Sequence, residues 1–126
     1  MINLQKIFKI GYGFGFGGTF ATNAKYTARH KKTLSFFCIN SKGNFIDTSA
    51  SYGHGTSEKL IGKLDKNIKK KIFISTKVSA SNLSYKNFIK STLKSIQNLR
   101  VKKIDLIQPH WPNYKLHNKK LTYLQL

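Results

Sequence analysis

Short apolar segments recur along this sequence at nearly equal spacing, and a helical pattern separates them. Three of these segments begin near residues 44, 72 and 104, so successive starts lie 28 and then 32 residues apart. A β-strand with its crossover helix takes about 30 residues. Strands that alternate with helices favour a parallel sheet, so the spacing predicts an α/β protein built of βα units.

The positions of the elements follow from residue type and period. Strands are predicted over residues 7–12, 44–47, 71–78 and 104–108. The third strand has the strongest pattern, and the fourth is expected to be buried. Helices are predicted over residues 28–39, 57–66 and 85–99, with Ser84 as an N-cap, and a weaker helix follows Pro112. Two architectures fit this order: a doubly wound open sheet and a (β/α)8 barrel.

The net charge of the chain invites a nucleic-acid interpretation. The sequence has 23 basic residues against 4 acidic ones, a net charge of +19, and a pI near 10.2. However, all the basic residues except Arg29 and Arg100 are lysine, whereas arginine is preferred for phosphates and base edges. Lysine, asparagine, isoleucine, phenylalanine and tyrosine all have codons rich in A and T. A skewed genome therefore accounts for the charge, and nucleic acid is not favoured as a partner.

Several other classes are excluded by composition. No stretch of about 18 apolar residues is present, so no membrane-spanning helix is expected. The single cysteine, Cys38, excludes a disulfide framework and a cysteine zinc site, and the sparse histidines and carboxylates predict no other metal site. The stretch after residue 10 is too rich in glycine for a secretory signal, so a cytoplasmic location is expected.

Polar side chains gather where the predicted strands end. Asp47 closes the second strand, Lys77 lies near the end of the third, His110 follows the fourth, and Tyr52 lies in the loop after Asp47. Any one of them has an ordinary structural explanation. Because sites form at the carboxyl ends of parallel strands, all four together predict a functional site on one rim of the sheet.

Three segments carry a resemblance to the aldo-keto reductases. They are FIDTSASYGHGTSEKLIG from Phe45, ISTKV from Ile74 and IDLIQPHWPN from Ile104, in the family's order within about residues 7–113. The resemblance implies a (β/α)8 barrel. It also implies that NADPH, or less often NADH, serves to reduce aldehydes and ketones to alcohols without a metal.

The resemblance assigns a catalytic tetrad to Asp47, Tyr52, Lys77 and His110. Tyr52 would protonate the carbonyl oxygen, and the ammonium group of Lys77 would stabilise the resulting phenolate. Asp47 would hold Lys77 in place. His110 would hydrogen-bond the carbonyl oxygen and orient it. Trp111 would form an apolar wall of the substrate pocket, although ordinary core packing explains it equally well.

The glycine-rich segment from Gly13 to Gly18 matches G-x-G-x-x-G. A dinucleotide-binding loop of that type needs a helix directly after it and an acidic residue about 20 positions on. Residues 19–26 are polar and irregular, and the next carboxylate is Asp47, so this interpretation is not favoured. In the family the first-strand loop approaches the nicotinamide, so the resemblance leaves the Gly13 backbone and Asp47 as cofactor-binding candidates. The alternation of aromatic residues with glycine also fits stacking on single-stranded RNA.

The length of the chain departs from the family pattern. A (β/α)8 barrel needs about 200 residues or more, so residues 1–126 are expected to form an incomplete barrel domain of about four βα units. Its first and fourth strands should be edges, and its inner face should expose apolar side chains. We therefore expect self-association or a complementing C-terminal half. The alternative function is a non-catalytic basic half-barrel that binds nucleic acid or a protein partner.

Overall fold

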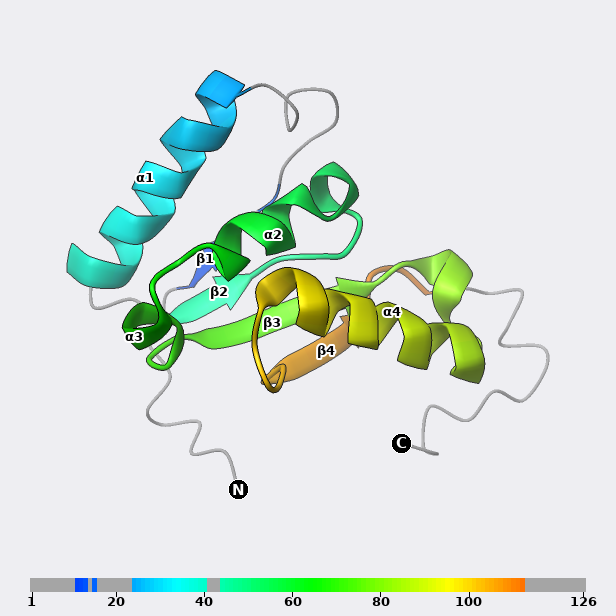
Figure 1. Ribbon diagram of the computed structural model, residues 1–126. Coiled ribbons are helices and arrows are strands. Elements are labelled where there is room, and N and C mark those ends of the chain that lie inside the picture. Colours follow the sequence, from blue (N-terminus) through cyan, green and yellow to red (C-terminus); the bar gives the residue numbers. More distant parts are fainter. Residues whose placement is uncertain (1–10, 14, 16–23, 41–43, 113–126) are drawn as a thin grey trace.

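The computed structural model of the chain describes residues 11–13, 15, 24–40 and 44–112 (Figure 1). The strands are β1 (Tyr12–Gly13), β2 (Phe45–Asp47), β3 (Phe73–Val78) and β4 (Leu106–Pro109). The helices are α1 (Ala24–Asn40), α2 (Thr56–Gly62), α3 (Lys66–Lys69) and α4 (Tyr85–Leu99), with short 3-10 turns η3 (Tyr52–Gly55) and η4 (Ala80–Asn82). The predicted weak helix after Pro112 lies outside the described residues.

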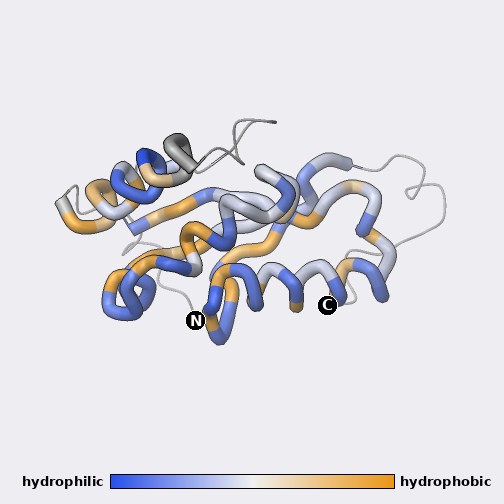
Figure 2. Tube along the Cα trace, turned by 45° about the horizontal axis from the view of Figure 1, so that its top comes forward, coloured by the Kyte–Doolittle hydropathy of each residue, from blue (hydrophilic) through white to orange (hydrophobic). Residues whose placement is uncertain are grey.

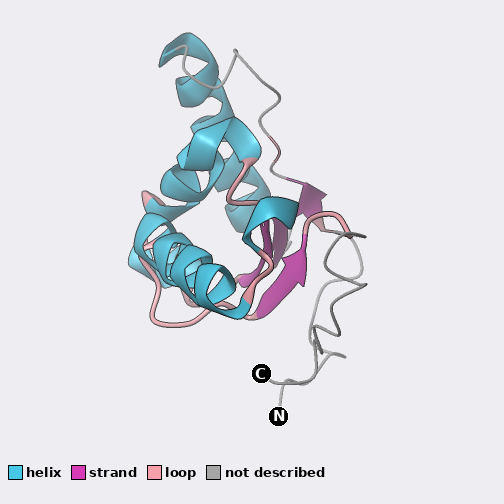
Figure 3. Ribbon diagram, turned by 90° about the vertical axis from the view of Figure 1, so that its right-hand side faces the viewer, coloured by secondary structure: helices cyan, strands magenta, loops and turns pink. Residues whose placement is uncertain are grey.

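The strands form one parallel sheet in the order β1-β2-β3-β4. The described helices all lie on one face of this sheet, as Figures 1 and 3 show. A doubly wound sheet reverses its strand order and carries helices on both faces. Sequential order with a single helical layer is instead the arrangement of a (β/α)8 barrel, so the structure favours the second of the two predicted architectures.

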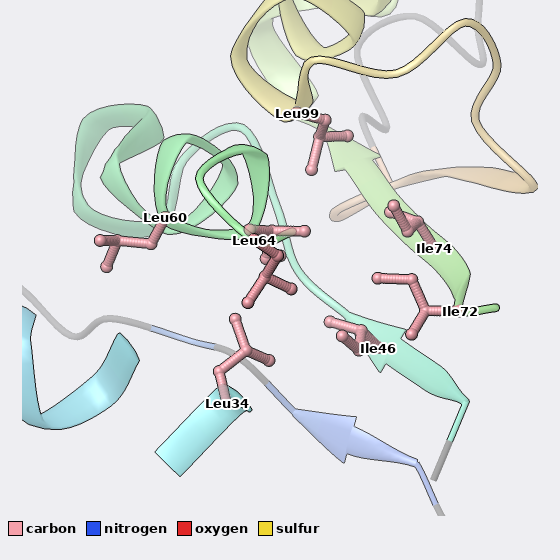
Figure 4. Close-up of a cluster of buried hydrophobic side chains, with 8 residues drawn as sticks. Leu34, Ile46, Leu60, Leu64, Ile72, Ile74 and Leu99 are labelled. Carbon is pink, nitrogen blue, oxygen red and sulfur yellow. The ribbon is translucent and has the colours of Figure 1, made fainter. Parts of the chain in front are cut away.

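The hydrophobic core lies between the sheet and this helical layer (Figure 4). Ile46 of β2 and Ile74 of β3 are register partners and point toward the helices. Side chains from α1, the α2 region, the start of β3 and the end of α4 complete the cluster, namely Leu34, Leu60, Ile61, Leu64, Ile72 and Leu99. Burial of such side chains stabilises each by about 1.5–3 kcal/mol, so this cluster holds the helices against the strands.

The apolar stripe predicted for α4 is only partly buried. Hydrophilic and hydrophobic residues alternate along this helix, as Figure 2 shows. Leu99 is fully buried, whereas Tyr85 and Leu93 are 67% and 55% exposed. Ser84 occupies the predicted N-cap position, but its side chain makes no capping hydrogen bond. Within the described residues, only the end of α4 near α2 therefore contributes to the core.

Three predictions about the elements were wrong in detail. Helix α1 begins at Ala24, four residues earlier than expected. The helix predicted over residues 57–66 is two helices, because Asp65 caps α3 by accepting a hydrogen bond of 2.7 Å from the Asn67 N–H. Strand β4 is not buried, and Leu106 is 37% exposed. It pairs with β3, and among the described residues its other edge has no strand partner.

The face of the sheet away from the helices carries both apolar and polar residues. Near the amino ends of β2 and β3, the register partners Phe45 and Phe73 stack with ring centroids 5.5 Å apart. Toward the carboxyl ends of the strands, the same face carries Asp47, Ser75 and Lys77, because side chains alternate along each strand. This alternation brings the polar residues of the predicted site together.

Candidate active site

An ion pair between β2 and β3 forms the centre of the site. The Lys77 Nζ donates to Asp47 Oδ2 at 2.5 Å and to the Thr48 carbonyl oxygen at 2.9 Å. The Ser75 hydroxyl donates to the other carboxylate oxygen, Asp47 Oδ1, at 3.1 Å. The Lys77 side chain is 15% exposed and that of Asp47 34% exposed. The ammonium group is therefore held in one position, because a partly buried pair with further hydrogen bonds is better fixed than a surface pair.

Tyr52 lies beside this ion pair and also contacts His110. The Lys77 Nζ is 5.3 Å from the centroid of the Tyr52 ring, a cation–π contact. The ring of His110 meets that of Tyr52 edge-on, with centroids 5.3 Å apart and planes at 87°. The structure thus brings Asp47, Lys77, Tyr52 and His110 into one cluster, although Lys77 contacts the face of the Tyr52 ring.

His110 is fixed by hydrogen bonds on its backbone and its ring. Its N–H donates to the Val78 carbonyl oxygen at 2.8 Å, which extends the pairing of β4 with β3. Its Nδ1 lies 3.0 Å from the Ser49 hydroxyl oxygen and 2.9 Å from that of Ser51. Burial, followed by the charge of Lys77, lowers the pKa of His110 below its ordinary 6.5. The imidazole is therefore neutral near pH 7, so it can donate a hydrogen bond without carrying a positive charge.

This lowered pKa predicts a loss of stability in acid. The unfolded chain takes up a proton at about pH 6.5, whereas folded His110 resists protonation until a lower pH. Its contribution to the free energy of unfolding is thus present above pH 6.5 and is lost as the pH falls through the folded pKa. We expect urea midpoints to decrease between about pH 7 and about pH 5, and to decrease less in His110→Gln. An equal decrease in both proteins would contradict this assignment.

Trp111 and the glycine loop border the cluster. The Trp111 ring stacks on that of His110 with centroids 5.7 Å apart and is 68% exposed, so it is not ordinary core packing. Gly13 is the register partner of Asp47, and a Cβ added to Gly13 would meet nothing within 4 Å. A Cβ on Gly15 would lie 3.5 Å from the Tyr52 ring. Open space therefore lies at Gly13, beside Asp47, whereas Gly15 packs close to Tyr52.

A buried polar network behind the site was not predicted from the sequence. Glu58 of α2 is fully buried, and its Oε1 accepts from the Thr76 hydroxyl at 2.8 Å. Its Oε2 accepts from the Asn98 amide at 2.9 Å. The hydroxyls of Thr48 and Ser57 are also paired, 2.7 Å apart. The sequence held one signal of this network. Glu58 is one of only 4 acidic residues, and it lies in the same predicted helix as the apolar Leu60 and Ile61.

Other types of site have no support in the described part of the chain. Residues 11–13, 15, 24–40 and 44–112 contain no cluster of three or more side chains suited to a metal ion. Within those same ranges, none of the helices has the length and apolar character needed to cross a membrane. Burial raises the pKa of the Cys38 thiol to about 11, so this thiol is a poor nucleophile.

A family model for the aldo/keto reductase family matches residues 9–125. The chain belongs to this family. A search among curated protein sequences found no match. The crystal structure of the thermostable aldo-keto reductase Tm1743, in complex with the inhibitor epalrestat, is 30% identical with a TM-score of 0.73. That match covers 83% of this chain and 39% of Tm1743.

Two further aldo-keto reductase structures support the fold. The Klebsiella pneumoniae enzyme in complex with NADPH is 19% identical with a TM-score of 0.74, over 84% of this chain and 36% of that one. The Bombyx mori enzyme in complex with NADP is 20% identical with a TM-score of 0.63, over 82% and 34%. This aldo/keto reductase chain thus spans less than half the length of these relatives. Its described strands and helices form an α/β fold with a parallel sheet, as in the barrels of this family.

Proposed function

We propose that this chain carries the proton-transfer half of an NAD(P)H-dependent carbonyl reductase, which converts an aldehyde or ketone to an alcohol. The observation that supports this most is the cluster in which Lys77 contacts both Asp47 and the Tyr52 ring. A cytoplasmic location remains our prediction.

The side chains of the cluster suit separate roles in this reaction. The Tyr52 hydroxyl donates a proton to the carbonyl oxygen, and the nearby Lys77 ammonium stabilises the phenolate that remains. Asp47 holds Lys77 through their ion pair. His110 donates a hydrogen bond to the same carbonyl oxygen and fixes its direction, while the exposed Trp111 ring offers an apolar wall for the substrate.

The residues near β1 fit a nicotinamide cofactor. The open space at Gly13, the register partner of Asp47, leaves room for part of a cofactor beside the ion pair. The Gly13 backbone and Asp47 would hold the cofactor at this end. When it is bound, NADPH or NADH supplies the hydride.

The first experiment tests whether Tyr52 supports turnover. The full 126-residue chain is co-expressed with the part of Tm1743 that follows its fourth strand, and NADPH oxidation by a simple aldehyde is followed by absorbance. We expect no turnover by the chain alone, because it spans a minority of the relatives' length. The complemented complex should turn over, and Tyr52→Phe should lower kcat about 100-fold or more, the usual contribution of a general acid.

The matched control is Tyr85→Phe, because Tyr85 is a 67% exposed tyrosine on α4. It should leave kcat unchanged. A complex that binds NADPH, as judged by cofactor fluorescence, yet turns over equally fast with and without the Tyr52→Phe substitution would exclude Tyr52 as the proton donor. A complex that binds NADPH and reduces no aldehyde would reject the proposed reaction.

A second candidate function, binding of single-stranded RNA, is favoured by one cavity. This cavity of about 710 Å³ lies at the opposite end of the strands from Lys77. Its lining includes seven basic side chains, from Lys63, Lys66, Lys69, Lys70, Arg100, Lys102 and Lys103. Burial lowers the pKa of Lys69, and the charges of Arg100 and Lys66 lower it further, so these cations repel one another. An anionic ligand would relieve this repulsion.

Salt-dependent titration tests this alternative. We expect weak RNA binding whose affinity falls steeply between two salt concentrations, because bound phosphates release counterions. Under the RNA-binding function, a triple variant with Lys66, Lys70 and Lys102 changed to Glu should bind much more weakly than one with Lys86, Lys90 and Lys94 changed to Glu. Equal losses in the two variants would show that net charge, and not the cavity, binds the RNA.

A further inference from the structure

We infer that the hydroxyl groups of Ser49 and Ser51 set the tautomer of His110, so that Nδ1 is unprotonated and Nε2 carries the proton toward the substrate. Both serines act here as positioning residues. This inference rests on the proposed function for the use of the Nε2 proton, although the tautomer itself can be measured without any turnover.

The two serines surround a single ring nitrogen. Ser49 Oγ and Ser51 Oγ lie 3.0 Å and 2.9 Å from His110 Nδ1, and 3.0 Å from each other. A neutral imidazole has one N–H donor and one acceptor nitrogen, whereas a hydroxyl can donate or accept. The protonation of Nδ1 therefore depends on where the two hydroxyl protons are directed.

The surroundings of Ser49 limit those directions. Ser49 is fully buried, and its Oγ already accepts a hydrogen bond of 3.2 Å from the Ser51 N–H. Besides His110 Nδ1 and Ser51 Oγ, the acceptor near its hydroxyl is the Lys77 carbonyl oxygen, at 3.5 Å, the limit of hydrogen-bond length. If Nδ1 is protonated it is no longer an acceptor, so either the exposed Ser51 hydroxyl directs its proton to solvent or the Ser49 proton takes the long contact to the Lys77 carbonyl oxygen. An unprotonated Nδ1 instead receives a short hydrogen bond from Ser51 directly.

The surroundings of the His110 ring keep it uncharged near neutral pH, where the proton can lie on either nitrogen. Because the pKa of His110 is lowered by burial and by Lys77, and raised only in part by Asp47, the ring is neutral and must adopt one tautomer. The backbone hydrogen bond to Val78 and the stacking on Trp111 fix the ring, so the proton on Nε2 has a defined direction. Loss of the serine hydroxyls would leave the ring in place without selecting its tautomer.

Nitrogen-15 NMR of the histidine rings measures the tautomer. The full chain labelled at histidine is recorded slightly above pH 7, and His110→Gln assigns the His110 signals. We expect a pyridine-like Nδ1 and a pyrrole-like Nε2. In the double variant Ser49→Ala, Ser51→Ala, the fraction of rings protonated at Nδ1 should rise several-fold. Ser51→Thr in the otherwise native chain keeps a hydroxyl and should keep the native tautomer.

The control variant is Ser81→Ala, an exposed serine of η4, which should leave the His110 signals unchanged. A native chain with a pyrrole-like Nδ1 would overturn the inference, and so would a tautomer ratio that does not change in the double variant. Amide spectra show whether each variant is folded. Because these readouts need no cofactor, they fail or succeed separately from the test of Tyr52-dependent reduction.

Discussion

Replacing Gly62 with alanine should strongly destabilise the chain. A Cβ at this position of α2 would overlap the Asn98 carbonyl oxygen and lie 3.1 Å from the Leu99 carbonyl carbon. Both are backbone atoms at the end of α4, so neither can rotate away as a flexible side chain would. Alanine favours a helix over glycine by about 1 kcal/mol, but overpacking against backbone costs more. We expect a net loss of about 2–4 kcal/mol in the free energy of unfolding.

Gly13→Ala is the matched control, because a Cβ there meets nothing within 4 Å. Its free energy of unfolding should change by less than about 0.5 kcal/mol. Urea denaturation followed by circular dichroism measures both variants. A Gly62→Ala protein as stable as the native chain would mean that α2 and α4 do not pack at this distance.

Glu58→Ala should cause a loss of similar size for a different reason. Its carboxylate is the acceptor for the Thr76 hydroxyl and the Asn98 amide, and both Glu58 and Thr76 are fully buried. The alanine variant leaves these donors without their acceptor and opens a cavity. Each unsatisfied buried group costs about 1–3 kcal/mol, so we expect a loss of about 3–5 kcal/mol.

Glu58→Gln and Asp65→Ala separate the causes of this loss. Glutamine keeps the volume and one acceptor oxygen, so it should lose about 1–2 kcal/mol. Asp65→Ala removes an exposed N-cap and should lose about 1 kcal/mol. If denaturation midpoints showed Glu58→Ala to be no worse than Asp65→Ala, the buried network would have no special weight in stability.

The order of the elements could be predicted because it depends on local pattern. The run over residues 71–78 has strand propensity by itself, and the helical period of α4 is visible without any partner. The exposure of Leu106 could not be predicted in this way, because it depends on what covers β4. The division between α2 and α3 depends on one capping hydrogen bond at Asp65, which a periodicity argument does not see.

In the candidate site, too, some features follow from the local sequence, whereas others depend on contacts between residues far apart in the chain. Asp47, Lys77 and His110 could be placed on one rim because parallel strands end together. The contact of Ser49 and Ser51 with His110 joins positions about 60 residues apart through a loop, so no strand pattern predicts it. The burial of Glu58 likewise depends on Thr76 and Asn98, which lie 18 and 40 residues further along the chain.

Each acidic residue of the chain makes a specific hydrogen bond in the structure. Asp47 holds Lys77, Glu58 joins α2 to β3 and α4, and Asp65 caps α3. Asp105 accepts from the Ile74 N–H at 3.0 Å and from Lys103 at 2.9 Å. None of the four serves only to balance the surface charge, so the net charge of +19 reflects a surface left almost without acidic residues.

The pairing of Asp47 with Ser75 across β2 and β3 has a consequence for how the chain folds. Adjacent side chains of a strand point to opposite sides, so a slip of one residue would turn Lys77 toward the helices and bring Thr76 or Val78 to the open face. The slip would break the ion pair of Lys77 with Asp47 and place an ammonium group under the helices, at a high desolvation cost. The ammonium group that the proposed reaction uses therefore also penalises misaligned strands, so errors in folding and loss of the site should occur together.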